Sequence, residues 1–127
     1  MEIQKPRVLI MEDEVDLRKA LVDKLELEGY TVDSCADGVA GMAAAQKNTP
    51  DLLLLDILMP NKDGWEVIDD MSADPVLSEV PIIIVSNLDS SSRVYELTRD
   101  SQDIEYLVKS ENTIKEVVAK VNDKLGR

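Results

Sequence analysis

The chain has 127 residues, of which 44% are hydrophobic, so it is long enough to form one domain with its own core. Its formal net charge of −12 argues against nucleic acids and anionic membranes as partners, because both would repel it. The lack of histidine excludes histidine catalysis and histidine metal ligands, and the single cysteine, Cys35, cannot form an internal disulfide. No apolar run is long enough for a signal peptide or for membrane insertion. We therefore expect one domain over residues 1–127, without an output domain, in the reducing cytoplasm.

In chain order, the hydrophobic pattern predicts alternating strands and helices. The expected elements are a strand at 7–11, a helix at 13–29, a strand at 30–35, a helix at 38–48, a strand at 51–57, a helix at 64–71, a strand at 81–86, a helix at 90–102, a strand at 104–109 and a helix at 113–126. Three of the strands are almost continuously hydrophobic, which indicates that both of their faces are covered, as in a parallel sheet. The alternation predicts an α/β fold, a three-layer sandwich around a five-stranded parallel sheet with right-handed crossovers.

Polar side chains fall at the carboxyl ends of the expected strands, where sites form in open α/β sheets. They are Glu12, Asp13 and Glu14 after the first strand, Asp37 after the second, Asp56 after the third, Ser86 in the fourth and Lys109 in the fifth. Each has a plain structural explanation when it is taken alone, because acids cap helices, aspartate begins turns, and serine and lysine occur at strand ends. Together they predict one polar site at this edge of the sheet.

The chemistry of this predicted site favours metal-dependent phosphoryl transfer. Carboxylates that crowd together repel one another, and a bound divalent cation relieves that repulsion. Oxygen ligands without histidine or cysteine favour a hard ion, Mg²⁺ or Mn²⁺. Lys109 would neutralise a further anion, and Asp56, which follows a run of four leucines, would be held rigidly as a nucleophile.

Four stretches carry a resemblance to a known family. They are VLIMEDE at 8–14, LLLLDILMPNKDGWEV at 52–67, PIIIVSN at 81–87 and YLVKS at 106–110, and the second contains the pattern D-x-x-M-P-x-x-D-G at 56–64. With an acid pair upstream and a lysine downstream, this pattern resembles the receiver domain of two-component response regulators over essentially the whole chain. The resemblance implies a doubly wound (βα)5 fold of the flavodoxin-like type, with strand order 2-1-3-4-5.

The resemblance also implies a role for each residue of the predicted site. Asp56 would be the phosphoacceptor. Asp13 and Asp56 would ligate Mg²⁺ directly together with the backbone carbonyl of Leu58, and Glu12 would help through a bound water. Lys109 would pair with an oxygen of the phosphoryl group.

Two further residues would report the phosphorylated state. The resemblance implies that Ser86 donates a hydrogen bond to the phosphoryl group and shifts toward it. Tyr106 would then move inward as a switch residue, although without the resemblance an ordinary sheet aromatic is the better interpretation. Phosphorylation adds roughly −1.5 to −2 charge units, enough to bias such a two-state element.

Three positions depart from the family pattern. The family usually has Lys-Pro with a cis bond where this chain has Lys109-Ser110, so the reach of Lys109 depends on how that turn is built. Asn87 stands where a smaller residue is usual, and would crowd the phosphoryl pocket or hydrogen-bond within it. Leu58 and Leu88 flank the expected path of a hydrolytic water and cannot orient it, which predicts slow self-dephosphorylation.

We interpret the chain as a signalling switch whose only catalysis is its own phosphorylation and dephosphorylation. The donor would be a histidine kinase or a histidine phosphotransfer domain, and an output protein would bind the surface of the fourth helix, fifth strand and fifth helix. The alternative is a receiver-like interaction module that signals without phosphorylation. An aspartate-nucleophile phosphatase is disfavoured because Asp56 is followed by Ile57 and Leu58 and no second acid for acid–base work. A flavin-binding electron carrier ranks last, since no phosphate loop follows the first strand.

Overall fold

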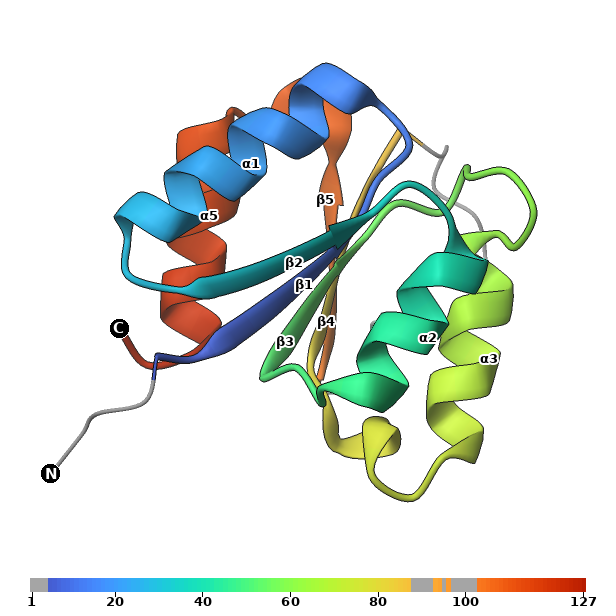
Figure 1. The fold of residues 1–127 in the computed structure, drawn as a ribbon. Coiled ribbons are helices and arrows are strands. Elements are labelled where there is room, and N and C mark those ends of the chain that lie inside the picture. The colour runs from blue at the N-terminus through green and yellow to red at the C-terminus, as the bar shows by residue number, and fades with distance from the viewer. Residues whose placement is uncertain (1–4, 88–92, 95, 97–102) are drawn as a thin grey trace, which may run out of the picture.

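The computed structural model describes residues 5–87, 93, 94, 96 and 103–127. Its centre is a parallel sheet in the order β2-β1-β3-β4-β5 (Figure 1). The strands are β1 (Arg7–Met11), β2 (Thr31–Cys35), β3 (Leu52–Leu55), β4 (Ile82–Ser86) and β5 (Ile104–Val108). The predicted fold class and strand order are therefore confirmed.

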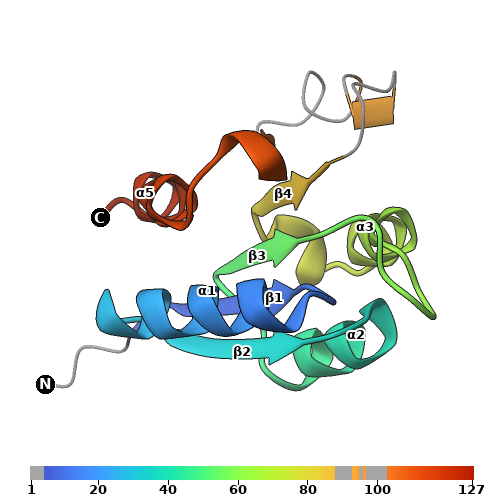
Figure 2. The same cartoon turned by 90° about the horizontal axis from the view of Figure 1, so that it is seen from above.

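Helices cover both faces of the sheet (Figures 1 and 2). The helices α1 (Val15–Leu27) and α5 (Ile114–Lys124) lie on one face, and α2 (Gly38–Lys47) and α3 (Gly64–Ala73) lie on the other. Two short 3-10 helices that the sequence pattern did not indicate, η1 (Leu77–Glu79) and η2 (Lys109–Glu111), precede β4 and follow β5. The helix expected at 90–102 falls mostly outside the described residues, and within that range 93, 94 and 96 are helical.

The continuously hydrophobic strands contribute side chains to two separate hydrophobic cores, one on each face of the sheet. In β3, Leu53 and Leu55 belong to the cluster under α2 and α3, whereas Leu52 and Leu54 belong to the cluster under α1 and α5. Successive side chains of a strand point to opposite faces, so a strand covered on both sides needs an apolar residue at every position. All four leucines are at most 2% exposed, so β3 gives the residue that follows it a closely packed, rigid base.

Two helix boundaries follow from local sequence. Gly29, two residues beyond α1, has a φ of +96°, a left-handed conformation that glycine adopts without steric cost and that ends the helix. The start of α5 is a capping box, in which Thr113 accepts the amide hydrogen of Glu116 and the Glu116 carboxylate accepts that of Thr113. These signals explain why α1 ends and α5 begins close to the predicted positions.

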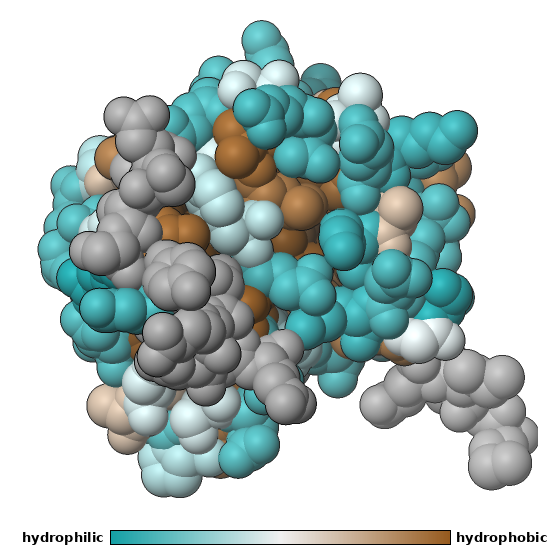
Figure 3. All heavy atoms as spheres, turned by 180° about the vertical axis from the view of Figure 1, so that it is seen from behind, coloured by the Kyte–Doolittle hydropathy of each residue, from teal (hydrophilic) through white to brown (hydrophobic). Residues whose placement is uncertain are grey.

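One face of the molecule is mostly hydrophilic. On the face opposite to the view of Figure 1, hydrophilic side chains cover most of the described area and hydrophobic ones show mainly in the gaps between them (Figure 3). Within the part of the chain that is described, no helix has the length and apolar character needed to cross a lipid bilayer.

Candidate functional site

The carboxyl ends of the strands bring the predicted polar residues together. The Asp56 amide donates to the carbonyl of Met11 over 2.9 Å, so β3 stays beside β1 for one residue beyond the strand. Residue Ser86 closes β4 and lies opposite Val108 in β5. Although the surroundings are apolar, Asp56 is 4% exposed and Ser86 is fully buried. Polar groups at this depth need partners, and here each finds the other.

Both carboxylate oxygens of Asp56 accept hydrogen bonds. The hydroxyl of Ser86 donates to Oδ1 over 2.9 Å, and the amide of Leu58 donates to the same oxygen over 3.2 Å. The ammonium of Lys109 donates to Oδ2 over 3.0 Å. The carboxylate is therefore fixed from three elements at once, the loop after β3, the end of β4 and the turn after β5.

The ammonium group of Lys109 holds three carboxylates around it. It lies 2.8 Å from Glu12 Oε1, 3.0 Å from Asp56 Oδ2 and 3.4 Å from Glu14 Oε2. Burial alone would lower the pKa of Lys109, but the hydrogen bonds to Glu12 and Asp56 outweigh burial and raise that pKa. Lys109 therefore stays charged, offsets the acids and lies within hydrogen-bonding distance of Asp56.

Among these acids, the carboxylate of Glu12 is the one whose charged form is disfavoured by burial. Burial raises the pKa of Glu12 to about 7, against the opposing effects of the hydrogen bonds from Lys109 and from the amide of Glu14. The neighbouring charge of Asp56 raises it further. A second positive charge in the site would relieve this cost of burying an acid beside another acid.

Three acids are placed to hold a metal ion. One carboxylate oxygen each of Glu12, Asp13 and Asp56 lies within 4.8 Å of the others. Two of these side chains are buried and Asp13 is exposed, so an ion could enter from solvent on the Asp13 side. The donors are all oxygens, as Mg²⁺ and Mn²⁺ prefer, so the residues present fit such an ion.

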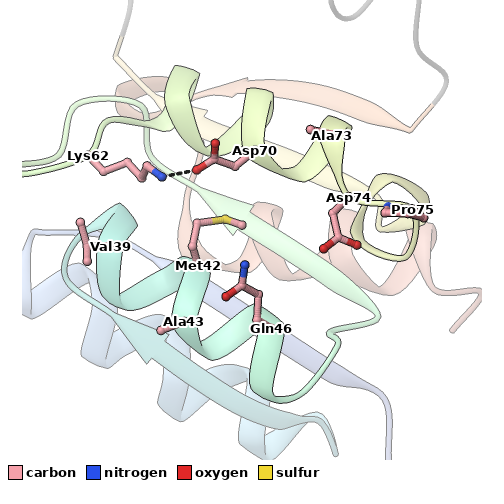
Figure 4. Close-up of a pocket in the computed structure, with 9 residues that line it drawn as sticks. All are labelled: Val39, Met42, Ala43, Gln46, Lys62, Asp70, Ala73, Asp74 and Pro75. Atoms are coloured by element: carbon pink, nitrogen blue, oxygen red, sulfur yellow. Dashed lines mark hydrogen bonds and ion pairs between the residues drawn. The ribbon is translucent and has the colours of Figure 1, made fainter.

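Most of the site residues line a small cleft. Its volume is about 200 Å³, and its lining includes Asp13, Glu14, Asp56, Leu58, Ser86, Asn87 and Lys109. A larger groove of about 620 Å³ lies elsewhere, between α2 and α3, where Lys62 pairs with Asp70 (Figure 4). We assign the functional site to the smaller cleft, because of these two clefts it is the one where a buried acid, Asp56, meets a hydroxyl, a cation and further carboxylates.

The predicted switch residues are in contact with each other. The hydroxyl of Tyr106 donates to the backbone carbonyl of Ser86 over 3.1 Å, and the Tyr106 side chain is half-buried against the core. The Lys109–Ser110 peptide bond is trans, since the described residues contain no cis bond. The amide of Ser110 donates to Oδ1 of Asn87 over 2.7 Å, a contact that the sequence did not reveal. Leu88 lies outside the described residues.

A second contact missed from the sequence holds the loop after β3. Asn61 has a φ of +68°, and its side-chain amide donates to Oδ2 of Asp37 over 2.8 Å. The other oxygen of Asp37 accepts the amide hydrogen of Ala40 and caps α2. The Ala40 and Asn61 hydrogen bonds lower the pKa of Asp37. The loop that carries Leu58 is thereby tied to the start of α2, and the residue type that signals it is asparagine at a turn.

We predict that Asn61 stabilises the protein in two ways, through its tolerance of a positive φ and through its hydrogen bond to Asp37. Asn61→Ala should destabilise the protein by about 1–2 kcal/mol, because alanine tolerates a positive φ poorly. Asn61→Gly keeps the conformation and loses only the exposed hydrogen bond to Asp37, so it should recover part of that loss. Urea unfolding of the two variants measures the difference. Equal stability of Asn61→Ala and the unmodified chain would contradict the prediction.

Comparison with known proteins shows which family the chain resembles. The profile of the response regulator receiver domain matches residues 8–122. The chain is 34% identical over 128 residues to a probable transcriptional regulator ycf27 of Cyanophora paradoxa, an alignment that covers 100% of this chain and 51% of that relative. It is 36% identical over 124 residues to the ycf27 protein of Guillardia theta, covering 97% of this chain and 46% of the relative. The chain thus spans about half the length of the curated relatives it matches.

Solved structures show the same fold. A putative response regulator from Chloroflexus aurantiacus superposes with a TM-score of 0.82 at 26% identity, covering 98% of this chain and 100% of the other. The chemotaxis protein CheY4 of Vibrio cholerae superposes with a TM-score of 0.83 at 23% identity, covering 94% and 98% of the two chains, and at that identity it speaks for the fold alone. The profile match extends over nearly the whole described sheet and its helices. This chain belongs to the response regulator receiver domain family.

Proposed function

We propose that the chain is a phosphoacceptor switch in which Asp56 receives a phosphoryl group, in a Mg²⁺-dependent reaction, from a histidine kinase or a histidine phosphotransfer protein. The observation that carries the proposal is the triple anchoring of Asp56 by Ser86, Lys109 and the Leu58 amide at the base of an open cleft. A nucleophile that is already held in one orientation loses little further conformational freedom when it attacks. We also propose that the switch works in the cytoplasm.

In the proposed reaction an oxygen of Asp56 forms a bond to phosphorus while the bond from phosphorus to the donor nitrogen breaks. The bonding electron pair leaves with the histidine nitrogen. Lys109 would turn its ammonium from Asp56 toward a phosphoryl oxygen, and Ser86 would redirect its hydroxyl in the same way. Bound by Glu12, Asp13, Asp56 and the carbonyl of Leu58, Mg²⁺ would supply further positive charge for the phosphoryl oxygens.

The output of the switch is proposed to pass through β4 and β5. Ser86 offers its hydroxyl to Asp56 and its carbonyl to Tyr106, so a shift of Ser86 toward a phosphoryl group would move the acceptor of the Tyr106 hydroxyl. A partner protein would read this change on the surface of β5, α5 and the helix that the sequence predicts at 90–102. Leu58, which is 59% exposed beside the cleft, has no group to orient water, in keeping with slow self-dephosphorylation.

One observation favours a second candidate function. Lys109 already contacts both buried acids, Glu12 and Asp56, so these two carboxylates have a cation partner without any ligand. A receiver-like module that binds partners without being phosphorylated would need nothing more. The two candidates differ in a single measurable event, the transfer of a phosphoryl group to Asp56.

The test is intact-protein mass spectrometry after incubation with acetyl phosphate and Mg²⁺. The proposal expects one added phosphoryl group, which is absent from Asp56→Asn and from samples with excess EDTA. Asp23→Asn, at an exposed position on α1, removes a carboxylate of the same type and should be phosphorylated normally. An unmodified chain that gains no mass would favour the interaction module, and a phosphorylated Asp56→Asn would place the acceptor elsewhere.

A further inference from the structure

The turn that carries Lys109 is capped by a side chain from another loop. The turn is the 3-10 helix η2, and the first amide groups of a short helix have no acceptor within it. The residue before the turn is Val108, whose side chain offers no acceptor. The carboxamide of Asn87 takes that role, because its Oδ1 accepts the amide hydrogen of Ser110 over 2.7 Å. The donor is a backbone N–H, so the oxygen of the carboxamide must face it.

The position of Asn87 follows from the register of the sheet. Ser86 and Val108 are paired residues at the ends of β4 and β5, so Asn87 and Lys109 each come one residue later. The hydrogen bond from Ser110 to Asn87 thus continues the link between the two strands past the end of the sheet. At the same turn, the side-chain amide of Asn112 donates to the carbonyl of Val108 over 2.8 Å. Lys109 lies between the two backbone groups that these hydrogen bonds hold, the carbonyl of Val108 and the amide of Ser110.

We propose that Asn87 is a positioning residue that holds the turn after β5 so that the ammonium of Lys109 lies between Glu12 and Asp56. This inference rests on the proposed function for its consequence in phosphoryl transfer, but its structural content can be measured separately. Lysine has a flexible side chain that loses rotamer freedom when it is fixed. When the backbone on both sides of Lys109 is anchored, only the side chain itself remains to be ordered.

Asparagine suits this position for an electrostatic reason. Asn87 lines the same cleft as Asp56 and Lys109, where a phosphoryl group would arrive with negative charge. An aspartate would accept the Ser110 amide equally well but would add another negative charge to a cleft that already holds several acids. A leucine of similar size would offer no acceptor. Serine at 110 completes the pair, because a proline there would have no N–H to donate.

The hydrogen bond itself is tested by amide exchange, with no need for phosphorylation. NMR-detected exchange at position 110 should be at least about fivefold faster in Asn87→Leu than in the unmodified chain, because a net hydrogen bond of about 1 kcal/mol is lost. Asn87→Asp keeps an acceptor and should restore protection. Ser110→Ala keeps the backbone donor and should exchange slowly as well. Unchanged exchange in Asn87→Leu would overturn the proposal at its first step.

Action through Lys109 is tested by a double-mutant cycle with Lys109→Met, which removes the charge and keeps the apolar stem. Phosphorylation by acetyl phosphate should be slowed about tenfold by Asn87→Leu in the unmodified background, since small displacements of a catalytic group are costly. It should be unaffected by the same change in the Lys109→Met background. Equal slowing in both backgrounds would show that Asn87 does not act through Lys109.

The same four proteins are then compared by urea unfolding, which is independent of the proposed function. Positioning predicts that the two substitutions are coupled, so their combined effect on the unfolding constant differs from the product of the single effects by about fivefold. Additive effects would overturn the positioning role even if phosphorylation occurs. Coupled unfolding in a chain that takes no phosphoryl group would support the positioning role and reject the phosphoacceptor function.

Discussion

Lys109→Met is expected to slow phosphorylation of Asp56 by about a hundredfold or more, the usual effect of removing one preorganised charge donor from a transferring group. The reason lies in the balance of charge in the cleft. Lys109 is the cation that contacts both Glu12 and Asp56, at 2.8 and 3.0 Å. Without it, an incoming phosphoryl group meets buried carboxylates with only a metal ion to offset them. The substitution should slow mainly the chemical step and should affect binding of the phosphoryl donor little, since the apolar stem of the side chain is retained.

The measurement is the rate of phosphorylation by acetyl phosphate at saturating Mg²⁺. Lys120→Met is the matched control, because Lys120 is half exposed on α5, lies 3.8 Å from Glu105, and changes the net charge equally. It should leave the rate within about twofold, as expected for an exposed ion pair. Lys109→Arg is informative too, because a planar guanidinium does not reproduce the point charge of an ammonium, so it should rescue only in part. A full rate in Lys109→Met would remove Lys109 from the proposed reaction.

Most of the fold could be predicted because the sequence repeats one physical signal. A strand buried on both faces must be apolar at every position, and Leu52–Leu55 meets that condition with four leucines. Once parallel strands are expected, their carboxyl ends meet at one edge, and the residues that follow them must meet as well. For this reason Glu12, Asp56 and Lys109 could be brought together from the sequence, although they are far apart along the chain.

What the sequence left open depends on single side chains that bond to a distant backbone or loop. The contact of Asn87 with Ser110 spans 23 residues and that of Asn61 with Asp37 spans 24, and no periodic pattern encodes either. Strand ends were also less well defined, since β3 ends at Leu55 while Asp56 still bonds to the neighbouring strand. The departure at Ser110 raised doubt about the reach of Lys109, whereas a trans peptide bond places its ammonium 3.0 Å from Asp56.

Gly64→Ala is expected to destabilise the protein by about 2 kcal/mol and to disturb Asp56 at the same time. A methyl group at Gly64 would lie 2.7 Å from Cα of Ile57 and 2.8 Å from the carbonyl oxygen of Asp56. Both are backbone atoms that cannot rotate away, so α3 or the chain beneath it must move, and overpacking of this kind costs about 1–3 kcal/mol. Alanine would gain up to about 1 kcal/mol over glycine in a helix, but Gly64 is the first residue of α3, where that gain is smallest.

Gly126→Ala separates this crowding from a general cost of replacing glycine. Gly126 has a φ of +73° and nothing within 4 Å of an added methyl group, so its replacement should cost about 1–2 kcal/mol through backbone strain alone. Urea unfolding should therefore show both variants destabilised. Phosphorylation should be slowed about tenfold or more in Gly64→Ala only, because only there does the added methyl group press on the backbone that carries the nucleophile. Normal phosphorylation of a destabilised Gly64→Ala would mean that the strain is absorbed by α3 and that the position of Asp56 is set by Ser86 and Lys109 instead.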